Sequence, residues 1–335
     1  MDSGRGRRRA EAARKAAAPS VMPRLVKPST RAFLDEARGL SGYSLLDRLH
    51  GYIYLRWPYL YIGVGTGEHR LARPLLAIWR FIGFSARRSN GAEPPVEPRC
   101  VFADGYHGKV VPPDEARELV TVNKALSLRA PEQVIPYSRA RDIVLRNPDH
   151  IVALDCPCRS ARPNPCRPLD VCLVVGEPFA GFVVEHHPER AKRITPERAT
   201  EILQEEHGRG HVHHAFFKDA MLGRFYAICN CCACCCGAMQ AFRKGVPMLA
   251  SSGYVSRIDG DLCNGCERCV DTCQFGAIRM GDLAAVVDEA LCMGCGVCVS
   301  QCDVEAAMLV RDPTKGEPLA LHELSQGASA PPSAN

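Results

Sequence analysis

Two stretches near the C-terminus carry the same cysteine pattern: residues 262–278 read LCNGCERCVDTCQFGAI and residues 291–307 read LCMGCGVCVSQCDVEAA. Each stretch has the spacing C-x2-C-x2-C-x3-C. The cysteines are Cys263, Cys266, Cys269 and Cys273 in the first copy and Cys292, Cys295, Cys298 and Cys302 in the second. Three thiolates at this spacing let one loop reach three irons of a cubane, and the fourth ligand must come from farther along the chain.

The repeat resembles the bacterial two-cluster [4Fe–4S] ferredoxins over about residues 255–312. The resemblance implies two pseudo-symmetric halves, each a β-hairpin and a helix, with strands at 254–259 and 283–288. It also implies crossed ligation, because each fourth cysteine serves the opposite cluster. One cluster is then held by Cys263, Cys266, Cys269 and Cys302, and the other by Cys292, Cys295, Cys298 and Cys273. The proline that follows the fourth cysteine in those ferredoxins is replaced here by Gln274 and Asp303.

Ten of the remaining eleven cysteines lie in two blocks upstream of the repeat. Residues 156–172 (CPCRSARPNPCRPLDVC) hold Cys156, Cys158, Cys166 and Cys172. Residues 229–236 (CNCCACCC) hold Cys229, Cys231, Cys232, Cys234, Cys235 and Cys236. Six cysteines in eight positions exceed what one cubane uses, so the second block feeds two clusters or leaves free thiols at an open iron site. If this block is helical, Cys229, Cys232 and Cys236 share one face.

We predict one or two further iron–sulfur clusters in residues 156–236, with zinc as the alternative and a catalytic dithiol as a third interpretation. The element Cys235-Cys236-Gly237 resembles the Cys-Cys-Gly element of heterodisulfide reductase-type subunits. The two blocks together resemble uncharacterised iron–sulfur modules that are fused to ferredoxin domains in anaerobic bacteria. Four histidines lie just upstream of the second block and are interpreted as core or surface residues rather than ligands. They are His207, His211, His213 and His214.

Charge is concentrated at the N-terminus of this 335-residue chain, whose formal net charge is +5. Residues 1–31 hold nine basic and two acidic side chains, which predicts a disordered basic tail over residues 1–30. Because no aromatic residue interleaves with the arginines, a solvated tail is favoured over a nucleic-acid-binding arm. The chain shows no signal peptide, so reduced, metal-bound cysteines in the cytoplasm are expected.

The chain is expected to fold as a multidomain α+β protein. The predicted units are the tail, an aromatic-rich region at 31–100, a Cys-rich α/β domain at 101–250, the dicluster domain at 251–312 and a disordered tail at 313–335. Helices are predicted after Ser44 and at 113–126, 137–146, 195–208 and 238–244, and strands at 52–62 and 151–155.

A short apolar helix is also predicted at residues 74–84 (PLLAIWRFIGF). It is too short to span a bilayer, and we favour docking on the Cys-rich domain over peripheral association with a membrane. The uncharged run at 225–242 is not interpreted as a membrane span, because many of its residues are candidate ligands. Gly63, Gly65 and Gly67 fail the G-x-G-x-x-G spacing, so no nucleotide cofactor is predicted.

These features favour electron transfer: the dicluster domain exchanges single electrons with a redox partner protein and relays them to the Cys-rich domain. One alternative is a redox enzyme with a substrate-binding, noncanonical cluster in residues 156–236. Another is a redox-sensing or nucleic-acid-binding iron–sulfur protein. The substrate and the partner are not encoded in any motif that we recognise.

Overall fold

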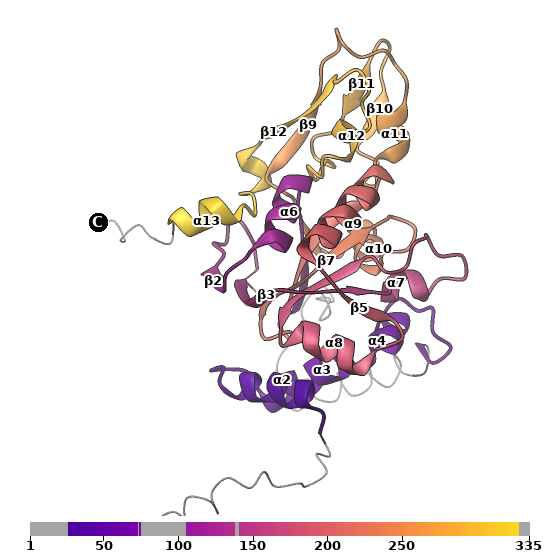
Figure 1. Ribbon diagram of the computed structural model, residues 1–335. Coiled ribbons are helices and arrows are strands. Elements are labelled where there is room, and N and C mark those ends of the chain that lie inside the picture. The colour runs from indigo at the N-terminus through magenta and orange to yellow at the C-terminus, as the bar shows by residue number, and fades with distance from the viewer. Residues whose placement is uncertain (1–25, 73, 75–104, 138–140, 328–335) are drawn as a thin grey trace, which may run out of the picture.

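A large mixed sheet forms the body of the protein. The computed structural model describes residues 26–72, 74, 105–137 and 141–327, and eight strands of the sheet lie in these ranges (Figure 1). The order is β2-β3-β4-β7-β6-β1-β8, with β5 paired to β3. The strands are β1 (Tyr106–Val110), β2 (Leu126–Arg129), β3 (Asp142–Leu154), β4 (Cys172–Glu177), β5 (Ala191–Ile194), β6 (Val212–Lys218), β7 (Arg224–Cys231) and β8 (Leu249–Ala250).

The core of the body is built on the antiparallel strands β6 and β7. Every residue of β6 is buried, and so are most residues of β7. Strands buried in this way require cover on both faces of the sheet. Helix α8 (Phe179–His186) lies on one side, and α6 (Pro113–Thr121) and α9 (Pro196–Gly208) lie on the other (Figure 1).

Three N-terminal helices pack beside α8: α2 (Pro28–Arg38), α3 (Leu45–Arg56) and α4 (Pro58–Gly65). The predicted helix after Ser44 is confirmed, since Ser44 and Asp47 form a capping box at the start of α3. Phe33 of α2 packs against Phe179 and Phe182 of α8. The described part of the aromatic-rich region therefore shares the core of the Cys-rich domain instead of forming its own.

Two sequence predictions in this body are wrong. Residues 52–62 are helical rather than a strand, because Pro58 begins a second helix and tyrosines of both helices turn toward the sheet. Residues 142–146, predicted as helix, belong to the long strand β3. Asn147 has a φ of +46°, and the pairing of β3 with β4 shifts register between Arg146 and Ile151. Asn147-Pro148 thus marks an irregularity within a strand rather than a helix end.

Other predicted elements are confirmed or shortened. The strand at 151–155 is the end of β3, and α9 begins where Thr195 accepts a hydrogen bond from the backbone N–H of Arg198. Helix α6 ends at Thr121, short of the predicted residue 126, which begins β2. Helix α10 (Gly237–Arg243) follows the cysteine block, but Cys229 and Cys231 lie on β7, so the block is not helical.

The dicluster region contains two small sheets and two short helices, as the resemblance implied. Strand β9 (Tyr254–Ile258) pairs with β12 (Ala307–Arg311), and β10 (Ile278–Met280) pairs with β11 (Ala285–Val287). Helices α11 (Arg268–Thr272) and α12 (Val297–Ser300) carry cysteines of the two copies. The region lies beyond α6 and α9 at one end of the body (Figure 1). Met293 and Val297 belong to the main core cluster, so this unit packs directly on the body.

The C-terminal segment differs from the predicted disordered tail. Residues 313–327 contain a 3-10 helix, η2 (Pro313–Lys315), and α13 (Leu321–Gly327). Leu319, Ala320 and Leu321 are buried, because this segment packs beside α6 and α6 contributes Glu118 as an acceptor for the Leu321 N–H.

No helix in the described ranges is long and apolar enough to cross a membrane. Residues 225–242 form β7, a turn and most of α10. Of the predicted disordered tail over residues 1–30, residues 1–25 lie outside the described residues, and so does the predicted helix at 74–84 apart from Pro74. The end of the predicted tail is wrong, because α2 begins at Pro28.

Candidate metal centres

The two copies of the cysteine repeat share their hydrogen bonds as well as their spacing. The N–H of Ala277 donates to Cys273 Sγ at 3.3 Å, and the N–H of Ala306 donates to Cys302 Sγ at 3.2 Å. Glu267 and Gly296 occupy equivalent positions, and both have a left-handed backbone, with φ of +63° and +79°. A left-handed residue before each short helix lets the loop curl around a common centre.

Cys273 of the first copy lines a small cavity together with Cys292, Cys295 and Cys298 of the second copy. The N–H of Ser256 donates to Cys292 Sγ at 3.4 Å, and the Cys298 thiol contacts Ser256 Oγ at 3.2 Å. Burial raises the pKa of Cys298 to about 11. Amide donors aimed at clustered, buried sulfurs suit the thiolate ligands of an iron–sulfur cluster. The donor set therefore fits a cubane.

The two triads differ in exposure. Cys266 is exposed, and Cys263 and Cys269 are partly exposed. In the second copy, Cys292 and Cys298 are each 7% exposed. The second triad lies toward the body, where Gln301 Nε2 donates to the carbonyl of Gly208 at the end of α9, at 3.1 Å. One triad therefore faces solvent, and the other lies next to the Cys-rich domain.

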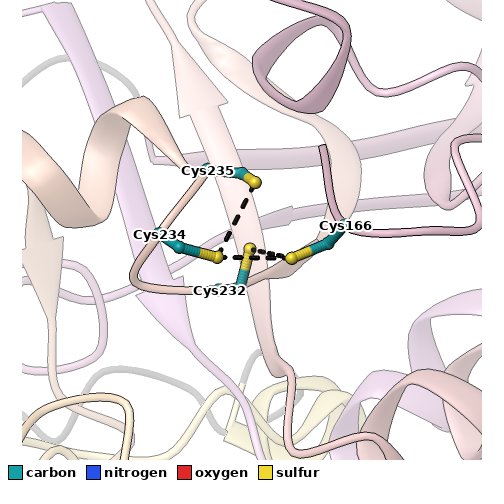
Figure 2. Close-up of side chains that lie close together, drawn as sticks. All are labelled: Cys166, Cys232, Cys234 and Cys235. Carbon is teal, nitrogen blue, oxygen red and sulfur yellow. Dashed lines mark hydrogen bonds between the residues drawn. The ribbon is translucent and has the colours of Figure 1, made fainter. Parts of the chain in front are cut away.

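Four cysteines of the two upstream blocks form a compact set, which we call the four-cysteine group: Cys166, Cys232, Cys234 and Cys235. Their sulfur atoms all lie within 4.8 Å of one another (Figure 2). Cys234 Sγ lies 3.3 Å from Cys166 Sγ and 3.7 Å from Cys235 Sγ. Burial acts to raise the pKa of Cys234, but the thiols around it hold that pKa below its ordinary value. This group can hold a metal ion.

Three side chains hold the turn that carries Cys232, Cys234 and Cys235. Gln240 Nε2 of α10 donates to the carbonyl of Cys234 at 2.8 Å. Gln274 Oε1, from the dicluster region, accepts from the N–H of Ala233 at 2.8 Å. Arg162 donates to the carbonyl of Cys235 at 3.4 Å and to Gln240 Oε1 at 2.6 Å. The turn is therefore tied to both the body and the dicluster region.

The other six cysteines of the blocks line a cavity of about 240 Å³, and we call them the six-cysteine group. They are Cys156, Cys158, Cys172, Cys229, Cys231 and Cys236. Cys172 and Cys229 are direct partners in the pairing of β4 with β7. The neighbouring Cys158 thiol, together with burial, raises the pKa of Cys156 to about 12. Cys158 contacts Cys236 in turn, and Cys236 contacts Cys231.

Tyrosines form another wall of the same cavity. Tyr54 of α3 and Tyr106 of β1 line it, and the hydroxyls of Tyr54 and Tyr226 are 2.8 Å apart. The Lys218 ammonium lies 4.3 Å from the ring centroid of Tyr54 and 4.7 Å from that of Tyr106. Burial lowers the pKa of Lys218 to about 7. The cavity therefore has thiols on one side and tyrosine side chains, with Lys218 behind them, on another.

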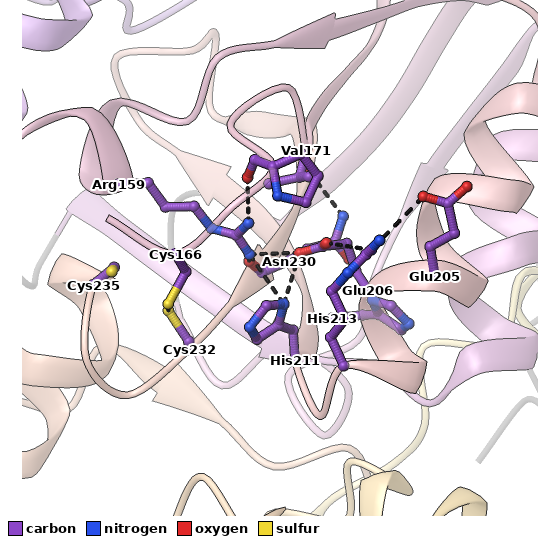
Figure 3. A network of polar contacts seen from close by, with 12 residues as sticks. Arg159, Cys166, Val171, Glu205, Glu206, His211, His213, Asn230, Cys232 and Cys235 are labelled. Carbon is purple, nitrogen blue, oxygen red and sulfur yellow. Dashed lines mark hydrogen bonds and ion pairs between the residues drawn. The ribbon is translucent and has the colours of Figure 1, made fainter. Parts of the chain in front are cut away.

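A buried ion pair fixes the two cysteine blocks against each other (Figure 3). Arg159 is 1% exposed and pairs with Glu206 of α9, whose side chain is fully buried, at 2.5 Å. The Arg159 guanidinium also donates to the carbonyls of Pro168, at 2.6 Å, and Asn230, at 3.1 Å. Asn230 lies between Cys229 and Cys231, so one side chain bridges both blocks. Sequence reasoning missed this role, because Glu206 is separated from both blocks in the chain.

The four histidines contribute to this packing. His211 Nδ1 lies 2.7 Å from Glu206 Oε2, and His213 Nδ1 lies 2.6 Å from Asn230 Oδ1. Burial lowers the pKa of His213 to about 3 and that of His214 to about 4. His207 is also buried. Among the described residues, neither the four-cysteine group nor the cavity of the six-cysteine group includes a histidine.

Comparison with protein families places residues 262–306 in the 4Fe-4S dicluster domain family. Comparison with curated proteins finds no match to the chain. The matched segment contains all eight cysteines of the repeat, and these supply the thiolate donors that the expected cofactor requires. Domains of this family bind [4Fe–4S] clusters, which supply one-electron chemistry. The match therefore indicates an electron-transfer role. Residues 262–306 are therefore a 4Fe-4S dicluster domain with two [4Fe–4S] clusters, joined to a body that carries a separate four-cysteine group.

Proposed function

We propose that this protein is an electron-transfer protein that accepts single electrons from a redox partner protein and passes them to its own Cys-rich domain. The observation that carries this proposal is the series of contacts from the exposed triad, through the more buried triad, to the four-cysteine group. Cys266 is exposed, Cys273 shares a cavity with the second triad, in which Cys292 and Cys298 are buried, and Gln274 contacts the turn of the four-cysteine group. This arrangement places the dicluster domain directly beside the turn of the four-cysteine group.

For the dicluster domain, we propose the crossed ligand sets. Cys273 serves with Cys292, Cys295 and Cys298, which is supported by the cavity that these four residues share. Cys302 then serves with Cys263, Cys266 and Cys269. When bound, the clusters supply one-electron oxidation and reduction. The chain's own residues hold the thiolates, donate backbone N–H groups to the sulfurs and exclude water from the inner triad.

The exposed triad is the proposed docking face for the redox partner. Glu267 and Arg268 flank Cys266 and Cys269 and are both exposed. Charged residues at the rim of a docking face act mainly on the association rate. The cytoplasm is the proposed location, because a reducing compartment keeps cysteine ligands available.

The experiment measures reduction of the anaerobically purified protein by a reduced flavodoxin or ferredoxin and, separately, by dithionite. Glu267→Arg is expected to change the rate with the protein donor at least threefold and to leave the dithionite rate unchanged. Glu132→Arg, at a side chain that is 75% exposed in the body, is the matched control and should change neither rate. Equal rates of reduction by the protein donor for wild type, Glu267→Arg and Glu132→Arg would contradict docking at the exposed triad.

A redox enzyme is the second candidate, and the cavity of the six-cysteine group favours it. Tyr54 and Tyr106 line the cavity with the thiols, and a phenol hydroxyl can donate a hydrogen bond or a proton to a bound molecule. The cavity volume, about 240 Å³, leaves room beside the sulfurs for a small molecule. Cyanide added to the reduced protein tests this candidate, since its EPR spectrum should change only if an iron keeps an open coordination position.

A further inference from the structure

The ten cysteines of residues 156–236 separate into two groups that do not follow the two blocks of the sequence. The first block gives Cys166 to the four-cysteine group and its other three cysteines to the six-cysteine group. The second block gives three cysteines to each group. Cys232 and Cys235 also reach the wall of the cavity, so the two groups are neighbours.

The sulfur spacing of the four-cysteine group matches a single metal ion. A tetrahedral ion with metal–sulfur bonds of about 2.3 Å places its ligand sulfurs about 3.8 Å apart. The sulfur atoms of Cys166 and Cys232 are 3.7 Å apart, and all four atoms lie within 4.8 Å. In a cubane each cysteine binds a different iron, so the ligand sulfurs must lie farther apart. The four-cysteine group is therefore too compact for a cubane.

The sulfurs of the six-cysteine group are spread around a cavity. Three or more ligand atoms from cysteine, histidine or acidic side chains can lie within 4.8 Å of one another. Among the described residues, the four-cysteine group is the one set that does so. The eight cysteines of the dicluster domain do not meet that criterion, and neither do the six around the cavity. The six-cysteine group, whose thiols contact in pairs, thus shares with the cysteines of the dicluster domain the lack of a single compact set. The cavity, at about 240 Å³, is far larger than one ion needs.

Backbone pairing and a buried ion pair fix the positions of cysteines around the cavity. Cys172 and Cys229 are fixed by the pairing of β4 with β7. Cys156 begins α7 (Pro157–Ser160), and its N–H donates to the carbonyl of Leu169 at 2.7 Å. Arg159 ties both segments to Glu206 and adds a cation near Cys156 and Cys172. A buried cation lowers the cost of bringing several thiolates together.

We propose that the six-cysteine group binds a polynuclear iron–sulfur cluster of at least four irons, and that the neighbouring four-cysteine group binds one tetrahedral metal ion, zinc or iron. This proposal rests on the proposed function, because both require metal in the Cys-rich domain. The new part is the assignment of particular cysteines to each of two metal centres. Six thiols exceed the four that one cubane uses, so the cluster is either larger than a cubane or leaves thiols free at its edge.

The test is a count of iron, zinc and acid-labile sulfide in anaerobically reconstituted full-length protein. A single-ion site contains no inorganic sulfide, whereas each cubane contains four. The dicluster domain accounts for about eight sulfides, so we expect at least about twelve per chain and one additional metal ion. Wild-type protein that contains only about eight sulfides would overturn the proposal without any variant.

Matched variants assign the two centres. Cys234→Ala, in the four-cysteine group, should lose about one metal ion and no sulfide. The double variant Cys172→Ala with Cys229→Ala should lose at least about four irons and four sulfides, and it should keep the ion of the four-cysteine group. Loss of sulfide from Cys234→Ala would overturn the assignment. The EPR signal of the reduced dicluster domain reports folding in each variant, and its reduction by a protein donor tests the electron-transfer proposal separately.

Discussion

Gln274 accepts a hydrogen bond from the N–H of Ala233 through its side-chain oxygen, at 2.8 Å. Gln274 directly follows Cys273, and Ala233 lies between Cys232 and Cys234. The Arg243 guanidinium donates to the Gln274 carbonyl, also at 2.8 Å. The position where the resembling ferredoxins carry proline is thus the point at which the dicluster domain holds the turn of the four-cysteine group.

Gln274→Ala is expected to weaken the four-cysteine group. The substitution removes the acceptor of the partly buried Ala233 N–H, which costs about 1 kcal/mol and frees the turn to move. The metal ion of the four-cysteine group should then be lost faster to a chelator, as measured by the release rate of zinc or iron from the folded protein.

The repeat supplies the control for this prediction. Asp303 occupies the position equivalent to Gln274 in the second copy and pairs with the exposed Arg268 instead of the body. Asp303→Ala should therefore leave metal release from the four-cysteine group unchanged. Equal acceleration by both substitutions would show that the contact of Gln274 has no particular role.

The crossed ligand sets predict which cluster each fourth cysteine serves. Cys273→Ser should damage the cluster of Cys292, Cys295 and Cys298, because Cys273 lines the same cavity as these three residues. Cys302→Ser should damage the other cluster. EPR of the two reduced variants decides the matter: damage confined to the triad nearest in sequence would contradict crossed ligation.

The Arg159–Glu206 pair is expected to be the main electrostatic support of the Cys-rich domain. Glu206→Gln keeps the shape of the side chain but leaves the buried Arg159 charge without its carboxylate partner, which costs about 3–5 kcal/mol. For a domain of this size, the thermal midpoint should fall by about 10 °C. Glu205→Gln, next in the chain and 42% exposed, should change it little. Similar midpoints for both variants would contradict this role.

The sequence predicted the dicluster domain well because its signals are local. The spacing within 262–278 sets the ligand loop, and Ser44 with Asp47 sets the start of α3 within four residues. The wrong predictions arose where pairing between distant segments decides the structure. Asn147-Pro148 is a turn signal locally, but the pairing of β3 with β4 and β5 keeps it within a strand.

The grouping of the ten cysteines could not be predicted for the same reason. Cys172 and Cys229 meet because β4 pairs with β7, and Cys166 reaches Cys234 because the loop before β4 passes over the turn after β7. Neither contact leaves a spacing pattern in the sequence. The density of cysteines indicated metal binding, whereas the assignment to two groups depends on the sheet.

His214 predicts how stability depends on pH. Burial lowers its pKa to about 4 in the folded protein, against about 6.5 in an unfolded chain. Between these values the unfolded chain binds a proton and the folded protein does not, so stability falls as the pH drops from about 7 to 4. The contribution of His214 to this loss is about 2 kcal/mol at pH 5. His214→Gln removes the titrating group, so the variant should gain about this much relative to wild type between pH 7.5 and 5. Comparing the two thermal midpoints at each pH cancels the acid sensitivity of the clusters. A constant difference across this range would show that folding does not lower the pKa of His214.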